Sequence, residues 1–359
     1  IYGGADSSPS NKTEEYNGTT WSVESTLGTA RYNHYGAGTN DTGALYAAGG
    51  PPSGLSIAEE YTKSINVITA AAWSSGGNMS TGRTTAGDCG VYNAGLVFGG
   101  NPTSAPYTSN LCEEYGGTSW TAGGTVPHAT SDLSGAGTQT AALCFGFSDS
   151  PTATTATYDG SSWTTVPGTV PGSTSQGRGI GTQTAAIHVG FASPGTTSLE
   201  YDGSSWTAGG TLNNKRSGQK PGGWGIQTAA IIASGYQTPP ATLISNTETY
   251  NGTSWTETGH SVLTAVKRTA GTTAGTSSNG MLMGGSDTPG NAVSTVVQKY
   301  NGTSWVTQPS LATSRFNHMG FGTATNAVVA SGQSPSITAA TEEFTGETTA
   351  LNIKTITTS

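Results

Sequence analysis

The 359-residue sequence is poor in charge, in cysteine and in long apolar stretches. Charged residues make up only 9% of it, and its 13 lysines and arginines form no basic run, which argues against nucleic acid as a partner. No apolar run approaches the roughly 18 residues of a membrane-spanning helix, so membrane insertion is not expected. The chain begins at Ile1 without a methionine or a signal-like segment, as a processed or truncated product would.

Three cysteines are too few and too scattered for a disulfide framework. Cys144 lies in the apolar run Ala-Ala-Leu-Cys-Phe-Gly, so we expect a buried free thiol there. Cys89 and Cys112 do not have metal-ligand spacing either. The sequence therefore predicts no metal and no cofactor.

Glycine is abundant instead, with 54 residues, and such a composition can belong to a disordered chain. Regularly spaced aromatic residues argue against disorder, because disordered chains lack them. The motif Tyr-Asp-Gly-Ser-Ser-Trp at 158–163 recurs, and its six copies that keep Tyr, Gly and Trp begin at Tyr16, Tyr115, Tyr158, Tyr201, Tyr250 and Tyr300. A repeat of this length is typical of propellers and solenoids.

Two further copies of the motif are degenerate, which brings the total to eight. The copy at Tyr61 has its tryptophan displaced downstream, to Trp73, and the copy at Phe344 has none. Consecutive copies lie 43 to 54 residues apart. Asn-Gly and Asp-Gly favour a tight hairpin turn, so the aromatic residue ends one strand and the tryptophan lies in the next, antiparallel strand.

Two other strands precede the motif in most units. One is a short apolar run stopped by glycine, as at Leu96 and Leu282, which is typical of a buried strand. Before it comes a small-residue segment that often begins with arginine, as at Arg83, and ends in a tight turn such as Gly-Thr-Gln-Thr-Ala-Ala. Small residues suit the crowded innermost strand of a radial blade. Four such strands repeated around an axis make a β-propeller.

This combination of arginine, paired glycines, tyrosine and tryptophan resembles kelch repeats over nearly the whole chain. The repeated Gly-Thr-Gln-Thr-Ala-Ala turn together with Tyr-Asp-Gly-Ser-Ser-Trp-Thr is similar to kelch-like repeats in structural proteins of marine bacteriophages. The resemblance implies an all-β kelch-like propeller and a place on a virion or tail. Several units have a single Gly or Gly-Phe where kelch repeats have Gly-Gly.

We predict one propeller domain over 1–359 with eight four-stranded blades. Seven blades plus a surplus terminal unit is the alternative. The first blade would lack its inner strand, because the chain starts at the second one, and 349–359 would supply the last outer strand. Each motif tryptophan is expected to be buried between neighbouring blades.

The candidate ligand-binding residues are five recurring arginines, two histidines that share one sequence context, and a tryptophan outside the motif: Arg31, Arg83, Arg216, Arg268, Arg315, His34, His318 and Trp224. A ring of arginines could bind an anion or a glycan carboxylate. Repetition favours a structural role instead, in which each arginine caps loops or pairs with an acid of the neighbouring blade. The tryptophan could stack on a sugar ring or be packed in the core.

Paired carboxylates occur before the motif aromatic in four units, at 14–15, 59–60, 113–114 and 342–343. Adjacent strand residues point to opposite faces, so the two carboxylates of a pair should not converge as catalytic acids and bases would. The loops after the apolar strands vary in length, and they should emerge on the same face as the connections between units. Variable loops on a rigid scaffold are a common place for binding.

These features favour a non-enzymatic extracellular module with a binding or structural role. We expect a phage virion or tail-fibre component that recognises a surface glycan or protein, alongside other virion or surface structural proteins. The alternative is a polysaccharide-degrading enzyme, a hydrolase or lyase, because a propeller fold does not settle function.

Overall fold

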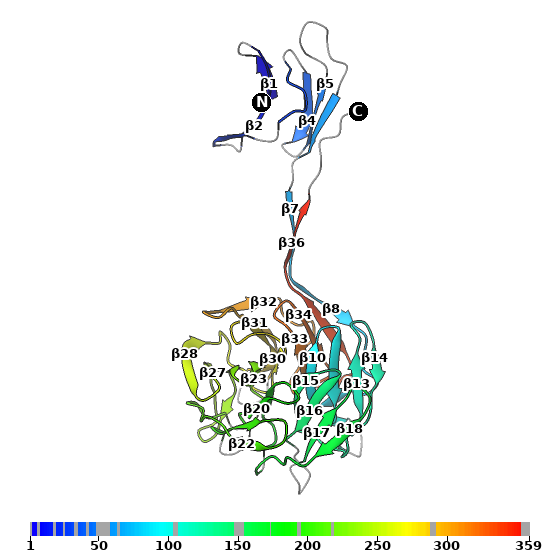
Figure 1. Cartoon of the computed structure of the whole chain (residues 1–359), viewed down its shortest axis with the longest axis vertical. Coiled ribbons are helices and arrows are strands. Elements are labelled where there is room, and N and C mark those ends of the chain that lie inside the picture. Colours follow the sequence, from blue (N-terminus) through cyan, green and yellow to red (C-terminus); the bar gives the residue numbers. More distant parts are fainter. Residues whose placement is uncertain are drawn as a thin grey trace. The chain divides into compact units, whose positions relative to one another are not determined.

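The structure is a computed structural model, and it describes residues 2–5, 8–16, 19–23, 26–31, 35–40, 43–47, 58–62, 65–102, 107–146, 154–172, 174–191, 195–216, 219–287 and 292–352. The chain divides into two compact units (Figure 1). The larger one, Ala71–Gly346, is called the propeller unit below. The smaller one, Ile1–Ala70 with Glu347–Ser359, is called the terminal unit. The single domain expected over 1–359 thus corresponds to two compact units.

The described residues of the propeller unit form six four-stranded antiparallel sheets, or blades. Blade 1 consists of β10 (Gly87–Val91), β11 (Ala94–Phe98), β13 (Cys112–Tyr115) and β14 (Trp120–Ala122). Blade 2 consists of β15 (Ser134–Thr138), β16 (Ala141–Phe145), β17 (Thr155–Tyr158) and β18 (Trp163–Val166). Blade 3 consists of β19 (Arg178–Gly181), β20 (Ala186–Val189), β21 (Ser198–Tyr201) and β22 (Trp206–Ala208).

Blade 4 consists of β23 (Gly222–Ile226), β24 (Ala229–Ala233), β27 (Asn246–Tyr250) and β28 (Trp255–Ser261). Blade 5 consists of β29 (Ala270–Gly271), β30 (Gly280–Ser286), β31 (Val293–Tyr300) and β32 (Trp305–Gln308). Blade 6 consists of β33 (Met319–Gly322), β34 (Asn326–Ala330), β35 (Thr341–Thr345) and β8 (Ala72–Gly76). Two-stranded ribbons form from β9 (Arg83–Thr84) with β12 (Asn101–Pro102), and from β25 (Tyr236–Gln237) with β26 (Thr242–Leu243).

The ring closes between the two ends of the propeller unit. Each inner strand lies beside the next, and β33 of blade 6 lies beside β10 of blade 1. The outer strand of blade 6 is β8, which comes from the start of the unit and pairs antiparallel with β35. Trp73 on β8 faces Phe344 on β35 in this ladder. The displaced tryptophan of the Tyr61 copy therefore completes the repeat that lacks its own.

The propeller unit closes with six blades, and the expected count of eight is not confirmed. Neither is the alternative of seven, because the copies at Tyr16 and Tyr61 both lie in the terminal unit. The end of the chain is not a blade's outer strand either. Of 349–359, the described part lies in β36 (Thr348–Asn352), which pairs with β7 (Ile65–Thr69). The physical reason is that Trp73 on β8 already occupies that place in blade 6.

Glycines allow the inner strands to approach one another around the axis. A Cβ atom at Gly179 would meet the carbonyl oxygen of Gly135, and one at Gly135 would meet the backbone of Asp88. Inner strands of neighbouring blades are thus in backbone contact, as the small-residue pattern predicted. The cores lie between blades and combine apolar strands with the motif aromatics.

The motif tryptophans are buried to different degrees. Trp206, Trp255 and Trp305 are buried, while Trp120 and Trp163 are half-buried. Several of them bond to the preceding blade through the indole N–H, as Trp206 does to the Thr155 hydroxyl at 2.9 Å. The expected burial between blades is confirmed for Trp206, Trp255 and Trp305, whereas Trp21 of the terminal unit is 52% exposed and contradicts it.

The described residues of the terminal unit form two three-stranded sheets and one ribbon. One sheet is β1 (Tyr2–Ala5), β2 (Pro9–Tyr16) and β3 (Trp21–Val23), and the other is β4 (Tyr35–Asn40), β5 (Gly43–Ala47) and β6 (Ala58–Thr62). The ribbon is β7 with β36. No helix in the described ranges is long and apolar enough to span a membrane.

Candidate functional site

The recurring arginines were the first candidates, and four of them are buried in ion pairs. Arg83 pairs with Glu113 at 2.6 Å and Arg315 with Glu342 at 2.5 Å. Arg216 pairs with Glu248 and, in the terminal unit, Arg31 with Glu59. Each glutamate lies about 30 residues downstream in the same repeat, not in the neighbouring blade as the structural alternative had it.

The glutamate of each pair also accepts hydrogen bonds from the connection that leads to the arginine. Glu342 accepts from the backbone N–H groups of Ala312 at 2.7 Å and Thr313 at 3.2 Å. In blade 4, burial opposes ionisation of Glu248, but Arg216 and the N–H groups of Asn213 keep its pKa below the usual value. These four arginines fasten the connections between repeats to the third strands, and they leave no guanidinium free to form an anion-binding ring.

The paired glutamates point to opposite faces, as predicted. Glu113 bonds to Arg83 within its own blade, whereas Glu114 accepts the Tyr158 hydroxyl of the next blade at 2.6 Å. Glu343 likewise accepts the Tyr115 hydroxyl across the closure of the ring. One member of the pair therefore stabilises a blade and the other joins two blades.

The remaining candidate residues do not form one common site. Trp224 is fully buried, and its indole N–H donates to the Thr276 carbonyl at 3.1 Å, so it is a core residue. His34 lies outside the described residues. His318 is buried and its Nε2 lies 2.8 Å from the Met283 carbonyl oxygen. Arg268 differs from the other arginines, because it is half-buried near the axis and donates to the Gln219 side chain at 2.6 Å.

The region around the axis contains a ring of backbone hydrogen bonds. Just before each inner strand, one residue adopts a positive φ, and these residues are Thr85, Asp132, Gln176, Lys220, Arg268 and Asn317. Their backbones are linked from blade to blade, as Asn317 N–H donates to the Arg268 carbonyl and Thr85 N–H to the Asn317 carbonyl, each at 3.0 Å. Six such bonds, counting those made by Gln219 and Leu133, close the circle. Non-glycine residues with this backbone are uncommon and often occur at binding sites.

The side chains of this ring line a pocket, which we call the axial mouth. Its lining comes from Asp132, Gln176, Gln219, Lys220, Arg268 and Asn317. The backbone repeats from blade to blade, but the side chains differ in charge and in hydrogen-bonding groups. A carboxylate, a guanidinium, an ammonium and three amides therefore converge from five blades.

The axial mouth lies on the face that carries the variable loops. Backbone bridges join a connection before an inner strand to a loop after a second strand in three blades: β9 with β12, Lys267 with Ser286, and Phe316 with Gln333. The prediction that these two kinds of segment emerge on one face is confirmed for these three loops.

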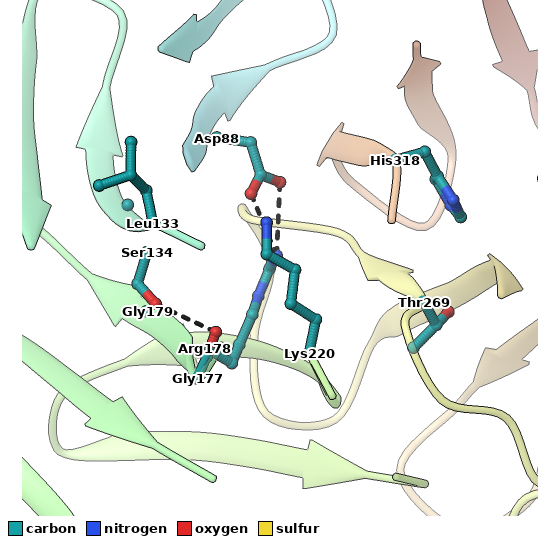
Figure 2. A pocket seen from close by; sticks show the side chains of 10 residues that line it. Asp88, Leu133, Ser134, Gly177, Arg178, Gly179, Lys220, Thr269 and His318 are labelled. Carbon is teal, nitrogen blue, oxygen red and sulfur yellow. Dashed lines mark hydrogen bonds and ion pairs between the residues drawn. The ribbon is translucent and has the colours of Figure 1, made fainter. Parts of the chain in front are cut away.

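A second pocket shares Lys220 with the axial mouth, and charged side chains occupy it (Figure 2). Asp88 projects from β10, at the position where the other inner strands carry glycine, and Arg178 and Lys220 point toward it (Figure 2). Arg178 Nη1 lies 3.3 Å from Asp88 Oδ2, and its other nitrogens donate to the Gly223 and Gly271 carbonyls at 3.0 Å. Asp88 and Arg178 thus connect four blades across the axis, and we call them the axial ion pair.

Lys220 connects the two pockets, because it lines both. Its Nζ donates to the Ala86 carbonyl at 2.5 Å. Burial lowers the pKa of Lys220 to about 8, while Asp88 and Asp132 favour its charged form. Burial also lowers the pKa of His318, which lines the deeper pocket, to about 3, so this imidazole is neutral at pH 7.

Sequence reasoning found Arg268 and His318 in this region and missed most of the rest. Asp88, Asp132, Gln176, Arg178 and Lys220 carried no repeated signal, and Asn317 was not singled out although it belongs to the sequence context that the two histidines share. Departures from the repeat could have served as a signal. Asp88 stands where the other inner strands have glycine, and the residues before the inner strands differ from unit to unit. No group of three or more potential metal ligands occurs within the described ranges.

No protein-family model matches the chain, and no curated protein matches it at a significant level.

Proposed function

We propose that the chain is a non-enzymatic extracellular binding module, a kelch-like component of a phage virion or tail, that recognises a surface glycan or protein through the loop face of its propeller. The observation that carries the proposal is the axial mouth. Six equivalent backbone positions hold six different side chains, of which five line the pocket together with Gln219. A purely structural ring would have no need for this diversity, since its backbone bonds alone join the blades.

The chemistry of the axial mouth suits a polyhydroxylated ligand. Amide groups of Gln176, Gln219 and Asn317 both donate and accept hydrogen bonds, and so they can pair with vicinal hydroxyls. Arg268 adds a planar donor that can bind a carboxylate, and Asp132 adds an acceptor. A short glycan segment, rather than an apolar molecule, is therefore the ligand class that we favour.

The alternative of a polysaccharide-degrading enzyme has less support in this geometry. Glycoside hydrolysis commonly needs two carboxylates that flank the scissile bond. Asp88 accepts from Arg178 and from the Gly320 N–H at 3.1 Å, which ties its carboxylate into the axial ion pair. Among the described residues, Asp132 is then the only carboxylate that lines the axial mouth.

A glycan array of neutral and acidic oligosaccharides, probed with the full chain, tests the proposal. We expect binding to at least one class, with a loss of tenfold or more in Arg268→Ala and in Gln176→Ala. Ile226→Ser is the matched control, because Ile226 is exposed at the inner-strand turn, away from the axial mouth. Binding that survives both axial variants would overturn the assignment of the site. Release of reducing ends from a bound polysaccharide would overturn the non-enzymatic assignment.

A further inference from the structure

The guanidinium of Arg268 is held in one orientation at the axial mouth. Its Nε donates to the Gln219 side chain at 2.6 Å, and its backbone N–H donates to the Gln219 carbonyl. The guanidinium carbon lies 5.6 Å from the ring centroid of Phe316, within the range of a cation–π contact. Gln219 precedes the inner strand of blade 4 and Phe316 precedes that of blade 6, so the connections on both sides position this side chain.

The two terminal nitrogens of Arg268 have no acceptor among the described residues. The bond from Nε to Gln219 is the only side-chain hydrogen bond that Arg268 makes in this part of the chain. In Arg216, by contrast, Nη1 bonds to Glu248 and Nη2 donates to the Asn246 carbonyl at 2.9 Å. Arg268 therefore presents a planar pair of N–H donors, the arrangement that binds a carboxylate through two parallel bonds.

The charges of the axial mouth also favour an anionic ligand. Its described lining has two cations, Lys220 and Arg268, and one carboxylate, Asp132, in a chain whose net charge is −8. Burial lowers the pKa of Arg268 and the charge of Asp132 opposes this shift, but no ion pair joins these two residues. A half-buried guanidinium without a counterion at contact distance is costly, and a bound anion would offset that cost.

The other lining groups suit the hydroxyls of one sugar ring. The side-chain amides of Gln176 and Asn317 line the pocket and make no hydrogen bond to other described residues. Gln219 turns its side-chain oxygen toward Arg268, which leaves its amide N–H groups to donate elsewhere. The axial mouth has a volume of about 220 Å³, less than the roughly 300 Å³ at which pockets for drug-sized ligands begin. This space is suited to a single sugar unit and not to several at once.

We infer that the axial mouth binds one acidic sugar unit of a glycan, and that the sugar carboxylate pairs with the two terminal nitrogens of Arg268. The inference rests on the proposed function, because it takes the axial mouth to be the glycan site. The amides of Gln176 and Asn317 then bind ring hydroxyls. A carboxylate is favoured over a phosphate ester, because Asp132 in the same lining would repel the second charge of a phosphate more strongly.

A glycan array tests this inference with the full chain. Each oligosaccharide that contains uronic or sialic acid is placed beside its carboxyl-reduced form, in which a primary alcohol replaces the carboxylate and the ring hydroxyls remain. Sulfated and neutral glycans complete the array. We expect at least one carboxylated glycan to bind, and its reduced form to bind at least about tenfold more weakly, as for the loss of a charged hydrogen bond. Added salt should weaken only the binding of the carboxylated form.

Two variants of Arg268 separate its charge from its shape. Arg268→Gln should lower the affinity for the carboxylated glycan by about tenfold or more and leave that for the reduced form nearly unchanged. Arg268→Lys keeps the charge without the planar pair of donors, so its affinity should be intermediate. Lys215→Gln is the matched control, since it removes a positive charge of the propeller unit at a residue outside the described lining. Near-ultraviolet circular dichroism confirms that each variant is folded.

Four results would overturn the inference. The first is equal binding of a carboxylated glycan and its reduced form, and the second is binding confined to sulfated glycans. The third is an equal loss for both forms in Arg268→Gln, which would mean that Arg268 only supports the structure. The fourth is binding of neutral glycans alone; if Gln176→Ala abolished it, the proposed function would still stand. An absence of binding to any glycan would overturn both this inference and the glycan form of the proposed function.

Discussion

The indole of Trp73 and the ring of Phe344 lie 5.2 Å apart, between centroids, in the blade that closes the propeller. The two residues face each other across the ladder of β8 and β35. In complete repeats, tyrosine and tryptophan of one motif make the same contact, at 4.9 Å for Tyr115 and Trp120. The two degenerate copies of the motif therefore supply one complete pair between them, and this pair holds the ends of the propeller together.

Replacing Trp73 by alanine should destabilise the propeller by about 2–3 kcal/mol, because it removes a half-buried aromatic from the closing blade. The hydrogen bond from its indole to the Pro309 carbonyl, 2.8 Å long, is lost as well. Urea unfolding followed by far-ultraviolet circular dichroism measures the loss. Trp21→Ala is the control, and it should leave the propeller transition unchanged. Equal effects of the two variants would contradict the role of Trp73 in closure.

Trp206→Ala should cost more than Trp163→Ala, although both residues belong to the same motif. Trp206 is 7% exposed and bonds to Thr155, whereas Trp163 is half-buried at the edge of its cluster. We expect about 3–5 kcal/mol for Trp206, the usual range for truncating a buried aromatic, and less for Trp163. The free energies of unfolding of the two variants decide the order, and a larger loss for Trp163 would contradict it.

Arg216→Met should destabilise the chain by about 3–5 kcal/mol, because it leaves Glu248 buried without its partner. The double variant Arg216→Met with Glu248→Gln should recover part of the loss. Arg268→Met is the control, since Arg268 bonds to Gln219 and is only half-buried. Chemical denaturation of the four proteins measures the differences. If Arg268→Met were as damaging as Arg216→Met, the distinction between a structural and a ligand-facing arginine would not hold.

Acid should destabilise the fold through two buried histidines. Burial lowers the pKa of both His188 and His318 to about 3, below the ordinary value of 6.5. Between pH 3 and pH 6.5 the unfolded chain binds protons that the folded chain does not. The free energy of unfolding is therefore highest above pH 6.5 and falls as the pH drops toward 3. Each histidine should contribute about 1–3 kcal/mol of that loss.

The measurement is the free energy of unfolding from pH 7 to pH 4 for the wild type and for His188→Gln. The variant should show a shallower loss with acid. His128→Gln is the control, because His128 is exposed. Parallel curves for the wild type and His188→Gln would show that this histidine does not cause the acid sensitivity.

Asp88→Gly gives blade 1 the residue that the other inner strands carry at this position, and yet it should destabilise the propeller by about 3–5 kcal/mol. The reason is that Arg178 and Lys220 would keep their charge near the axis without the carboxylate. Asp88→Gly combined with Arg178→Ala should be less harmful than Asp88→Gly alone. Thermal unfolding compares them, and a neutral Asp88→Gly would contradict the axial ion pair.

The repeat and its four strands could be predicted from the sequence, because both depend on local chemistry. The Asp-Gly and Asn-Gly turns place Tyr158 and Trp163 in paired strands without any help from distant residues. Glycines near the axis and opposed faces for Glu113 and Glu114 also follow from strand geometry. Hence the β-propeller, the inner strand and the structural use of the paired glutamates were accessible from residue patterns alone.

The blade count, the closure and the axial mouth were decided only by the tertiary structure. Counting copies could not show that Trp73 pairs with Phe344, because that contact depends on where the ring closes. Nor could it separate Arg268 from Arg216, which have similar sequence positions but different partners. Asp132 and Gln176 converge because one backbone geometry recurs around an axis, and convergence around an axis has no local signature in the chain.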